Sequence, residues 1–176
     1  MFWKRVNILR LVIVILLMTV GVLIASLTIG KDIYENKGMS MLSFAIVNFS
    51  GYLFFLFMPV ELAFIFYSQS GYNPWILYSV AVSTAIISQS VDYLIGYFFS
   101  KGIIHRLIGR RRYLKAEAEI RKYGRLALFV FNVLPLSSPV IALAAGMLKY
   151  RVKDALLYSA AGLLIKYLLL SLFFGL

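Results

Sequence analysis

The sequence predicts an all-α polytopic membrane protein, in which three spanning helices and two proline-broken re-entrant helical hairpins form an inverted repeat. The first observation is composition. Of the 176 residues 62% are hydrophobic and 14% are charged, and the mean hydropathy of +0.88 excludes an ordinary soluble domain. The second observation is that two long apolar stretches are interrupted by proline and polar residues. Unsatisfied backbone groups are costly in hydrocarbon, so broken helix is tolerated there only inside protein or beside a wet cavity.

Three uninterrupted apolar stretches are long enough to span a bilayer, for which about 20 residues suffice. They are 8–29, 75–100 and 155–176. The first follows basic residues, as a signal peptide does, but its apolar core is longer than that of a cleaved signal. We therefore interpret 8–29 as an uncleaved signal anchor.

The two interrupted stretches are 44–70, broken at Pro59, and 126–148, broken at Pro135 and Pro139. Proline removes a helix hydrogen bond and clashes with the preceding turn, so neither stretch is expected to form one straight helix. We expect each stretch to enter the membrane and return on the same side. The alternative is a protein with five ordinary spans that are kinked at proline.

The distribution of charge favours the re-entrant interpretation. The segment 101–125 holds nine Lys or Arg residues against two Glu, whereas the acids and bases of 31–43 balance. The positive-inside rule then places the amino terminus and 101–125 in the cytoplasm and 31–43 outside the cytoplasmic membrane. This arrangement requires 44–70 to return to the outer side.

A weak internal repeat relates the two halves, because a shift of 80 residues places Pro59 on Pro139 and Tyr78 on Tyr158. One re-entrant hairpin and one span per unit give an inverted repeat, with the site expected near the midplane. The expected division is an anchor helix with its outer loop, 1–43, and a membrane domain, 44–176. That domain contains repeat 1 at about 44–100, a basic cytoplasmic loop at 101–125 and repeat 2 at about 126–176.

Three charged residues inside apolar stretches are the main candidates for a functional site: Glu61, Asp92 and Lys166. A charge near the bilayer centre costs at least ~2.5 to 3.5 kcal/mol, so such residues usually face the protein interior. Glu61 either forms a proton or cation site or hydrogen-bonds to a neighbouring helix. Lys166 needs one of the two acids as a partner, and the pair is either a structural ion bridge or a phosphate-binding cation that stays neutralised until substrate arrives. Asp92 is expected near water.

Asn132, Ser137 and Ser138 surround the second break. Their side chains either donate to phosphate oxygens or satisfy the carbonyls that proline releases. With the three charged residues they form the predicted substrate or proton site.

A basic cluster precedes the second half of the chain. Its members are Lys101, Arg106, Arg110, Arg111, Arg112 and Lys115. Beside a membrane helix such clusters set topology and hold anionic headgroups, each residue contributing about 1 kcal/mol near the surface. We expect that role here and no nucleic-acid partner.

The chain lacks the side chains of the usual membrane enzymes. It has no cysteine and one histidine, so paired histidines, a serine with a histidine base and thiolate metal sites are all excluded. We expect no enzyme activity, metal or cofactor.

Several short motifs, taken in order, resemble the DedA family, whose domain is also named SNARE-associated or VTT. They are Met58-Pro59-Val60-Glu61, Tyr93-Leu94-Ile95-Gly96, Arg121-Lys122-Tyr123-Gly124, Leu134-Pro135-Leu136 and Ala144-Ala145-Gly146. The resemblance covers about 44–176. It implies an inverted pair of re-entrant hairpins and the movement of lipids, including polyprenyl phosphates, with proton coupling also associated with the family.

The chain departs from the family pattern at several polar positions. Asn48 stands where bacterial members often carry an acid, and Gln89 stands at their membrane acid, three residues before Asp92. The Arg-x-x-Pro-x-x-Arg element reads Asn132, Pro135 and Ser138 here.

These observations together predict a flippase or scramblase that moves a phospholipid or polyprenyl-phosphate headgroup. Two alternatives stay open: a proton-linked exporter of small ions or drugs, and a structural membrane protein without transport activity. The expected partners are membrane lipids, with protons or a cation as further candidates, and a homo-oligomer is left open.

Overall fold

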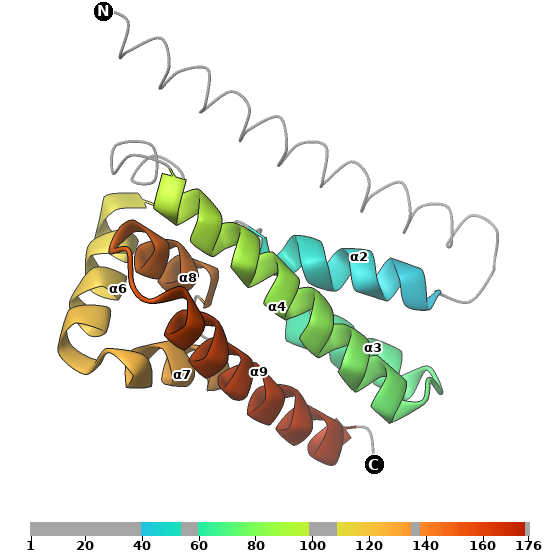
Figure 1. Cartoon of the computed structure of the whole chain (residues 1–176). Coiled ribbons are helices and arrows are strands. Elements are labelled where there is room, and N and C mark those ends of the chain that lie inside the picture. The colour runs from blue at the N-terminus through green and yellow to red at the C-terminus, as the bar shows by residue number, and fades with distance from the viewer. Residues whose placement is uncertain (1–39, 54–59, 99–108, 135–137, 175–176) are drawn as a thin grey trace, which may run out of the picture.

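A computed structural model describes residues 40–53, 60–98, 109–134 and 138–174, and these residues form helices without any strand (Figure 1). The expected all-α class is therefore confirmed for them. The helices are α2 (Met41–Tyr52), α3 (Val60–Gln69), α4 (Pro74–Phe98), α6 (Arg110–Tyr123), α7 (Arg125–Val133), α8 (Ser138–Met147) and α9 (Val152–Phe174). The predicted span 8–29, Pro59, Lys101, Arg106, Pro135, Ser137 and the side chain of Ser138 lie outside the described residues.

Two of the described helices are long and apolar enough to cross a membrane. With 25 residues in α4 and 23 in α9, and a rise of 1.5 Å per residue, they extend about 37 and 34 Å. They run antiparallel in Figure 1 and correspond to the predicted spans 75–100 and 155–176. Helices α2, α3, α7 and α8 have 9 to 12 residues each, too few to cross the hydrocarbon core alone.

Local sequence signals explain where the helices begin. The Ser40 side chain accepts a hydrogen bond from the Ser43 N–H at 3.1 Å, which caps α2. Helix α4 starts at Pro74, a residue favoured in the first turn because no helical hydrogen bond is lost there. The predicted break residue Pro139 likewise lies in the first turn of α8. Gly124, with a φ of +55°, separates α6 from α7.

The described helices follow the same order twice, with two short helices before one long helix. They are α2, α3 and α4 in the first half, and α7, α8 and α9 in the second, with α6 between the halves. Each long helix packs on the first short helix of its own half. Each also contacts the second short helix of the other half, α4 against α8 and α9 against α3. Helix α8 thus packs mainly on the long helix of the other half, whereas α3 contacts both long helices.

Helix α4 runs through the middle of the described helices and contributes to two apolar cores (Figure 1). One core joins α2, α3, the first part of α4 and the end of α9. The other joins α8 to α6, α7 and the last part of α4. Their fully buried members include Phe44, Phe64, Leu77, Leu163 and Tyr167 in the first core, and Tyr113, Leu128, Ile141, Leu143 and Ala144 in the second.

Glycine allows α4 and α8 to touch backbone to backbone. A Cβ atom added at Gly96 would overlap the Leu143 carbonyl, and one added at Gly146 would overlap the Tyr93 carbonyl. Small residues are common at contacts between membrane helices because they let the backbones approach closely. Both glycines belong to the motifs singled out in the sequence, and here they serve packing.

Candidate functional site

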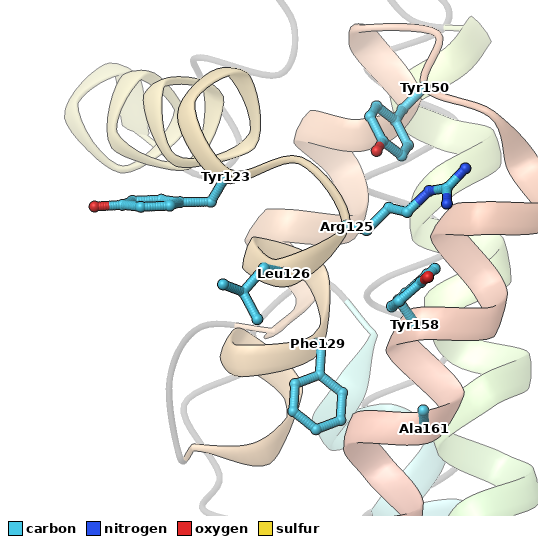
Figure 2. A pocket seen from close by; sticks show the side chains of 7 residues that line it. All are labelled: Tyr123, Arg125, Leu126, Phe129, Tyr150, Tyr158 and Ala161. Atoms are coloured by element: carbon cyan, nitrogen blue, oxygen red, sulfur yellow. The ribbon is translucent and has the colours of Figure 1, made fainter.

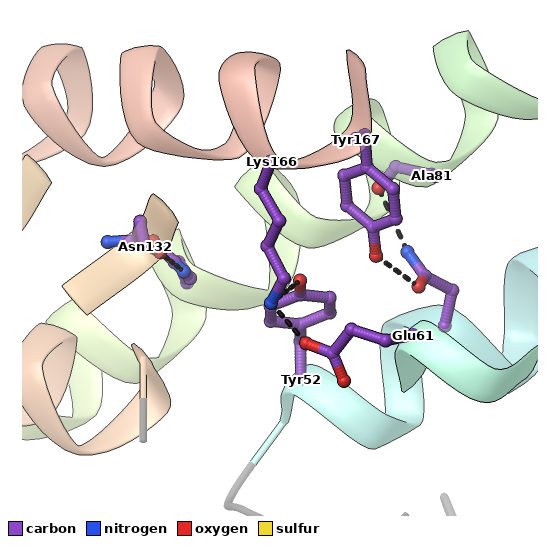
Figure 3. Close-up of polar contacts among 8 residues, drawn as sticks. Tyr52, Glu61, Ala81, Asn132, Lys166 and Tyr167 are labelled. Carbon is purple, nitrogen blue, oxygen red and sulfur yellow. Dashed lines mark hydrogen bonds and ion pairs between the residues drawn. The ribbon is translucent and has the colours of Figure 1, made fainter. Parts of the chain in front are cut away.

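Two of the predicted site residues, Glu61 and Lys166, form an ion pair between α3 and α9 (Figure 3). Lys166 lies about 21 Å along the helix from the start of α9 and about 12 Å from its end. The residue is only 4% exposed, whereas the side chain of Glu61 is 23% exposed. Of the two acids left open as partners of Lys166, the structure therefore selects Glu61.

Tyr52, the last residue of α2, completes this pair. Lys166 Nζ donates to the Tyr52 hydroxyl at 3.2 Å and lies 5.4 Å from the centre of the Tyr52 ring. The ring face provides a cation–π contact for the ammonium group. The ammonium group thus meets a carboxylate, a hydroxyl and an aromatic face, which come from both short helices of the first half.

A second set of hydrogen bonds adjoins the ion pair. Tyr167 donates its hydroxyl to Asn48 Oδ1 at 2.7 Å. The Asn48 amide donates in turn to the Ala81 carbonyl at 2.9 Å and to Thr84 Oγ1 at 2.8 Å. This set links α2, α9 and α4 with the polar atoms mutually satisfied, as buried polar groups require. We call Tyr52, Glu61, Lys166, Asn48 and Tyr167 the ion-pair site.

Sequence reasoning missed Tyr52 and Tyr167 as members of this site, and treated Asn48 only as a departure from a family pattern. One signal was present: Asn48 and Tyr52 are spaced i, i+4, which puts them on one face of a helix. The other signal was the position of Tyr167 directly after Lys166.

The structure places Asn132 in a different cluster, between α7 and α4. Asn132 donates to the Leu128 carbonyl at 2.8 Å and accepts from the Gln89 amide. Both residues are buried, and within the described part of the chain Gln89 Oε1 has no hydrogen-bond partner. Asp92 follows Gln89 by about one turn of α4 and is fully buried, so the expectation that it lies near water was wrong. Helix α8 packs against α4, and the sequence did not indicate this contact.

The described members of the basic cluster lie at the start of α6, where Arg110, Arg111, Arg112 and Lys115 are all exposed. The opposite face of α6 packs on α8. On that face burial, together with the smaller effect of the neighbouring Glu117 carboxylate, raises the pKa of Tyr113 to about 12. The hydroxyl of Tyr113 therefore stays protonated at neutral pH.

A groove of about 670 Å³ opens between α7 and α9 beside the end of α6 (Figure 2). Arg125 lies in it between Tyr150 and Tyr158, and its Nη2 donates to Asp154 at 3.0 Å. The rest of the wall comes from Tyr123, Leu126, Phe129 and Ala161. The sequence did not predict this groove, because Arg125 counted only toward the charge of the basic loop.

No group of three or more His, Cys, Asp or Glu side chains that could hold a metal ion occurs among the residues that the structure describes. The ion-pair site offers one carboxylate and one ammonium group, which suits an anion or a proton better than a divalent cation.

Comparison with protein families matches the chain to a model of the VTT domain over residues 55–175, more than two thirds of the chain. The chain belongs to the VTT domain family, the DedA family. It is therefore a membrane protein, in agreement with the two apolar helices α4 and α9. The chain matches no curated protein and no solved structure.

The VTT domain match divides the ion-pair site. Glu61, Lys166 and Tyr167 fall inside the matched residues, whereas Asn48 and Tyr52 on α2 precede them. The residues that contact Lys166 thus come from both sides of the boundary.

Proposed function

We propose that this VTT domain protein moves a phospholipid or polyprenyl-phosphate headgroup across the cytoplasmic membrane as a flippase or scramblase. The single observation that carries the proposal is the ion pair between the buried Lys166 and the partly exposed Glu61, which lies deep along α9 where an apolar side chain would insert more easily. Such a pair is weak support for stability, because the desolvation of the buried ion offsets much of the attraction. A role in binding a charged substrate gives the pair a reason to exist.

The proposed membrane topology has two re-entrant hairpins, α2–α3 and α7–α8, and spans at 8–29, α4 and α9. Short helix lengths support the hairpins, since none of the four helices could cross the bilayer alone. The basic charge of 101–125 supports a cytoplasmic amino terminus. Each unit then has one hairpin and one span, as in transporters built from inverted repeats.

Substrate binding would exchange one anion for another at Lys166. The carboxylate of Glu61 holds the ammonium group neutralised while the site is empty, and the phosphate of a lipid would take its place as the headgroup arrives. The partial exposure of Glu61 leaves that carboxylate able to swing toward water. Tyr52 contributes a hydroxyl that can donate to a phosphate oxygen.

The decisive experiment is a lipid-movement assay with two forms of the protein in liposomes. The wild-type chain should accelerate the movement of labelled anionic lipid over protein-free liposomes. The double variant Glu61→Gln/Lys166→Met should return to the protein-free rate, since it removes both charges while keeping the side-chain volumes. Arg121→Ala, on the exposed face of α6, is the matched control. Equal rates in the wild type and the double variant would contradict the proposal.

A proton-linked exporter is the second candidate, and one observation favours it. Glu61 is partly exposed and belongs to a site that also holds the Tyr52 and Tyr167 hydroxyls, which can relay protons. Under this alternative a pH gradient would drive the efflux of a small cation while labelled lipid stays in its leaflet. Measuring both quantities in the same liposomes separates the two candidates.

A further inference from the structure

We propose that the groove between α7 and α9 is a docking site for an anionic phospholipid from the leaflet that borders α6. This site is distinct from the ion-pair site, and binding there does not depend on lipid being transported. The groove has the size of a small-molecule site, for which volumes of about 300 to 1,000 Å³ are usual. Its walls come from the end of α6, the first part of α7, the turn before α9 and the first half of α9.

One end of the groove is suited to a phosphate group. Arg125 lies there between the side chains of Tyr150 and Tyr158 (Figure 2), and its guanidinium carbon lies 5.7 Å from the centre of the Tyr158 ring. The contact with Asp154 uses one nitrogen, Nη2, of a guanidinium that carries five N–H donors. The side chain is 51% exposed, so a phosphate can approach it. Arginine binds phosphate with parallel hydrogen bonds, which gives direction as well as affinity.

The surroundings of Arg125 carry a matching charge. Between residues 117 and 154 the chain has six basic side chains and three acidic ones. The basic ones are Arg121, Lys122, Arg125, Lys149, Arg151 and Lys153. All six come from the end of α6, the start of α7 and the turn before and into α9, which are the segments around the mouth of the groove. Asp154 pairs with only one of these six basic side chains, Arg125. The remaining excess of positive charge around the groove favours the binding of an anion.

The other end of the groove is suited to an acyl chain. Leu126, Phe129 and Ala161 line it, and Leu126 is 57% exposed. Phe129 lies about one helical turn beyond Arg125, so the wall changes from charged to apolar over about 6 Å along α7. A free phosphate ion would use only the first end. A phospholipid would use both, which is why we assign the groove to an intact lipid.

The test uses the full chain in vesicles that contain a photoactivatable phosphatidylglycerol, with crosslinked residues identified by mass spectrometry. The wild type should be crosslinked between residues 125 and 129. Arg125→Gln should reduce that crosslinking about tenfold, because a charge-assisted contact is lost. Lys37→Gln removes one positive charge from 31–43, which the positive-inside rule places on the opposite side of the membrane, and should leave crosslinking unchanged. An equal loss in both variants would show that net charge alone attracts the lipid and would overturn the proposal.

A second variant tests the groove without changing Arg125, in case the substitution of Arg125 disturbs folding. Ala161→Phe leaves the arginine in place and fills the apolar end, so it should also reduce crosslinking several-fold. Three results would overturn the docking site: full crosslinking in Ala161→Phe, equal labelling by a phosphatidylcholine probe, or displacement by soluble glycerol phosphate, which would indicate a small-anion site. Because lipid movement is not measured here, failure of the docking site and failure of the proposed transport function are told apart.

Discussion

The two short-helix pairs of this VTT domain protein place polar groups at corresponding positions but differ in chemistry. The pair α2–α3 gives Lys166 a carboxylate and a tyrosine, whereas α7–α8 gives α4 an amide, Asn132, and an apolar helix. The shift of 80 residues places Tyr52 on Asn132 and Glu61 on the fully buried Ile141. The same position therefore holds a charge in one half and a packing residue in the other. We infer that the pair α2–α3 supplies groups to the ion-pair site, whereas the matching positions of α7–α8 serve packing.

The largest expected effect tests the charge in the first half. Glu61→Ala leaves the Lys166 ammonium group buried without its carboxylate and should lower the free energy of unfolding by about 3 kcal/mol. The double variant Glu61→Gln/Lys166→Met should recover most of that loss, because neither charge remains. Unfolding in mixed detergent micelles measures both. A double variant as unstable as Glu61→Ala would show that the pair is needed for stability rather than for binding.

The next effect tests the packing in the second half. Gly96→Ala drives a methyl group into the Leu143 carbonyl, and we expect it to lower the free energy of unfolding by about 2 to 3 kcal/mol. Gly162 of α9 is a second closely packed glycine, where an added Cβ would lie 2.6 Å from the Phe129 carbonyl and 2.7 Å from Asn132 Cβ. Gly162→Ala should lose about 1 to 2 kcal/mol, since its nearest contact is longer than the one at Gly96. Thermal unfolding in detergent compares the two, and equal losses would contradict the ranking.

A smaller effect is expected at the amide pair. Asn132→Leu leaves the buried amide of Gln89 without its acceptor and should lower the free energy of unfolding by about 1 to 2 kcal/mol. The addition of Gln89→Leu should restore part of it, because both polar groups are then gone. Lipid movement should persist in the double variant. Its complete loss would mean that the second half also contacts the substrate, and the contrast between the halves would fail.

The smallest effect is expected at the hydrogen bond beside the ion pair. Tyr167→Phe removes the hydroxyl that donates to Asn48 and should lower the free energy of unfolding by about 1 kcal/mol. The exposed control Arg121→Ala should change it by less than about 0.5 kcal/mol, since surface ion pairs contribute little. Chemical unfolding of the three proteins side by side measures the difference.

Much of the fold followed from residue-by-residue properties. The apolar stretches around α4 and α9 were predicted as spans because hydrophobicity sums along one helix and needs no partner. The breaks before α3 and α8 were predicted from proline for the same local reason.

The site was predicted only in part. Glu61 and Lys166 stood out because each is a charge within an apolar stretch, but the choice between Glu61 and Asp92 as the partner stayed open. Tyr52 and Tyr167 did not stand out, since tyrosine is common throughout this chain. Arg125 was counted only in the net charge of 101–125, whereas in the structure it lines a separate groove.

Composition and the length of apolar runs are enough to establish a helical membrane protein with two apolar helices of spanning length, because both depend on each residue and its near neighbours. Which polar groups meet is decided by how α9 crosses α3 and how α4 crosses α8. Those crossings depend on small surfaces such as Gly96 against Leu143, where a single methyl group changes the distance between helix axes. The ion pair joins residues more than a hundred positions apart, and no local pattern records that contact.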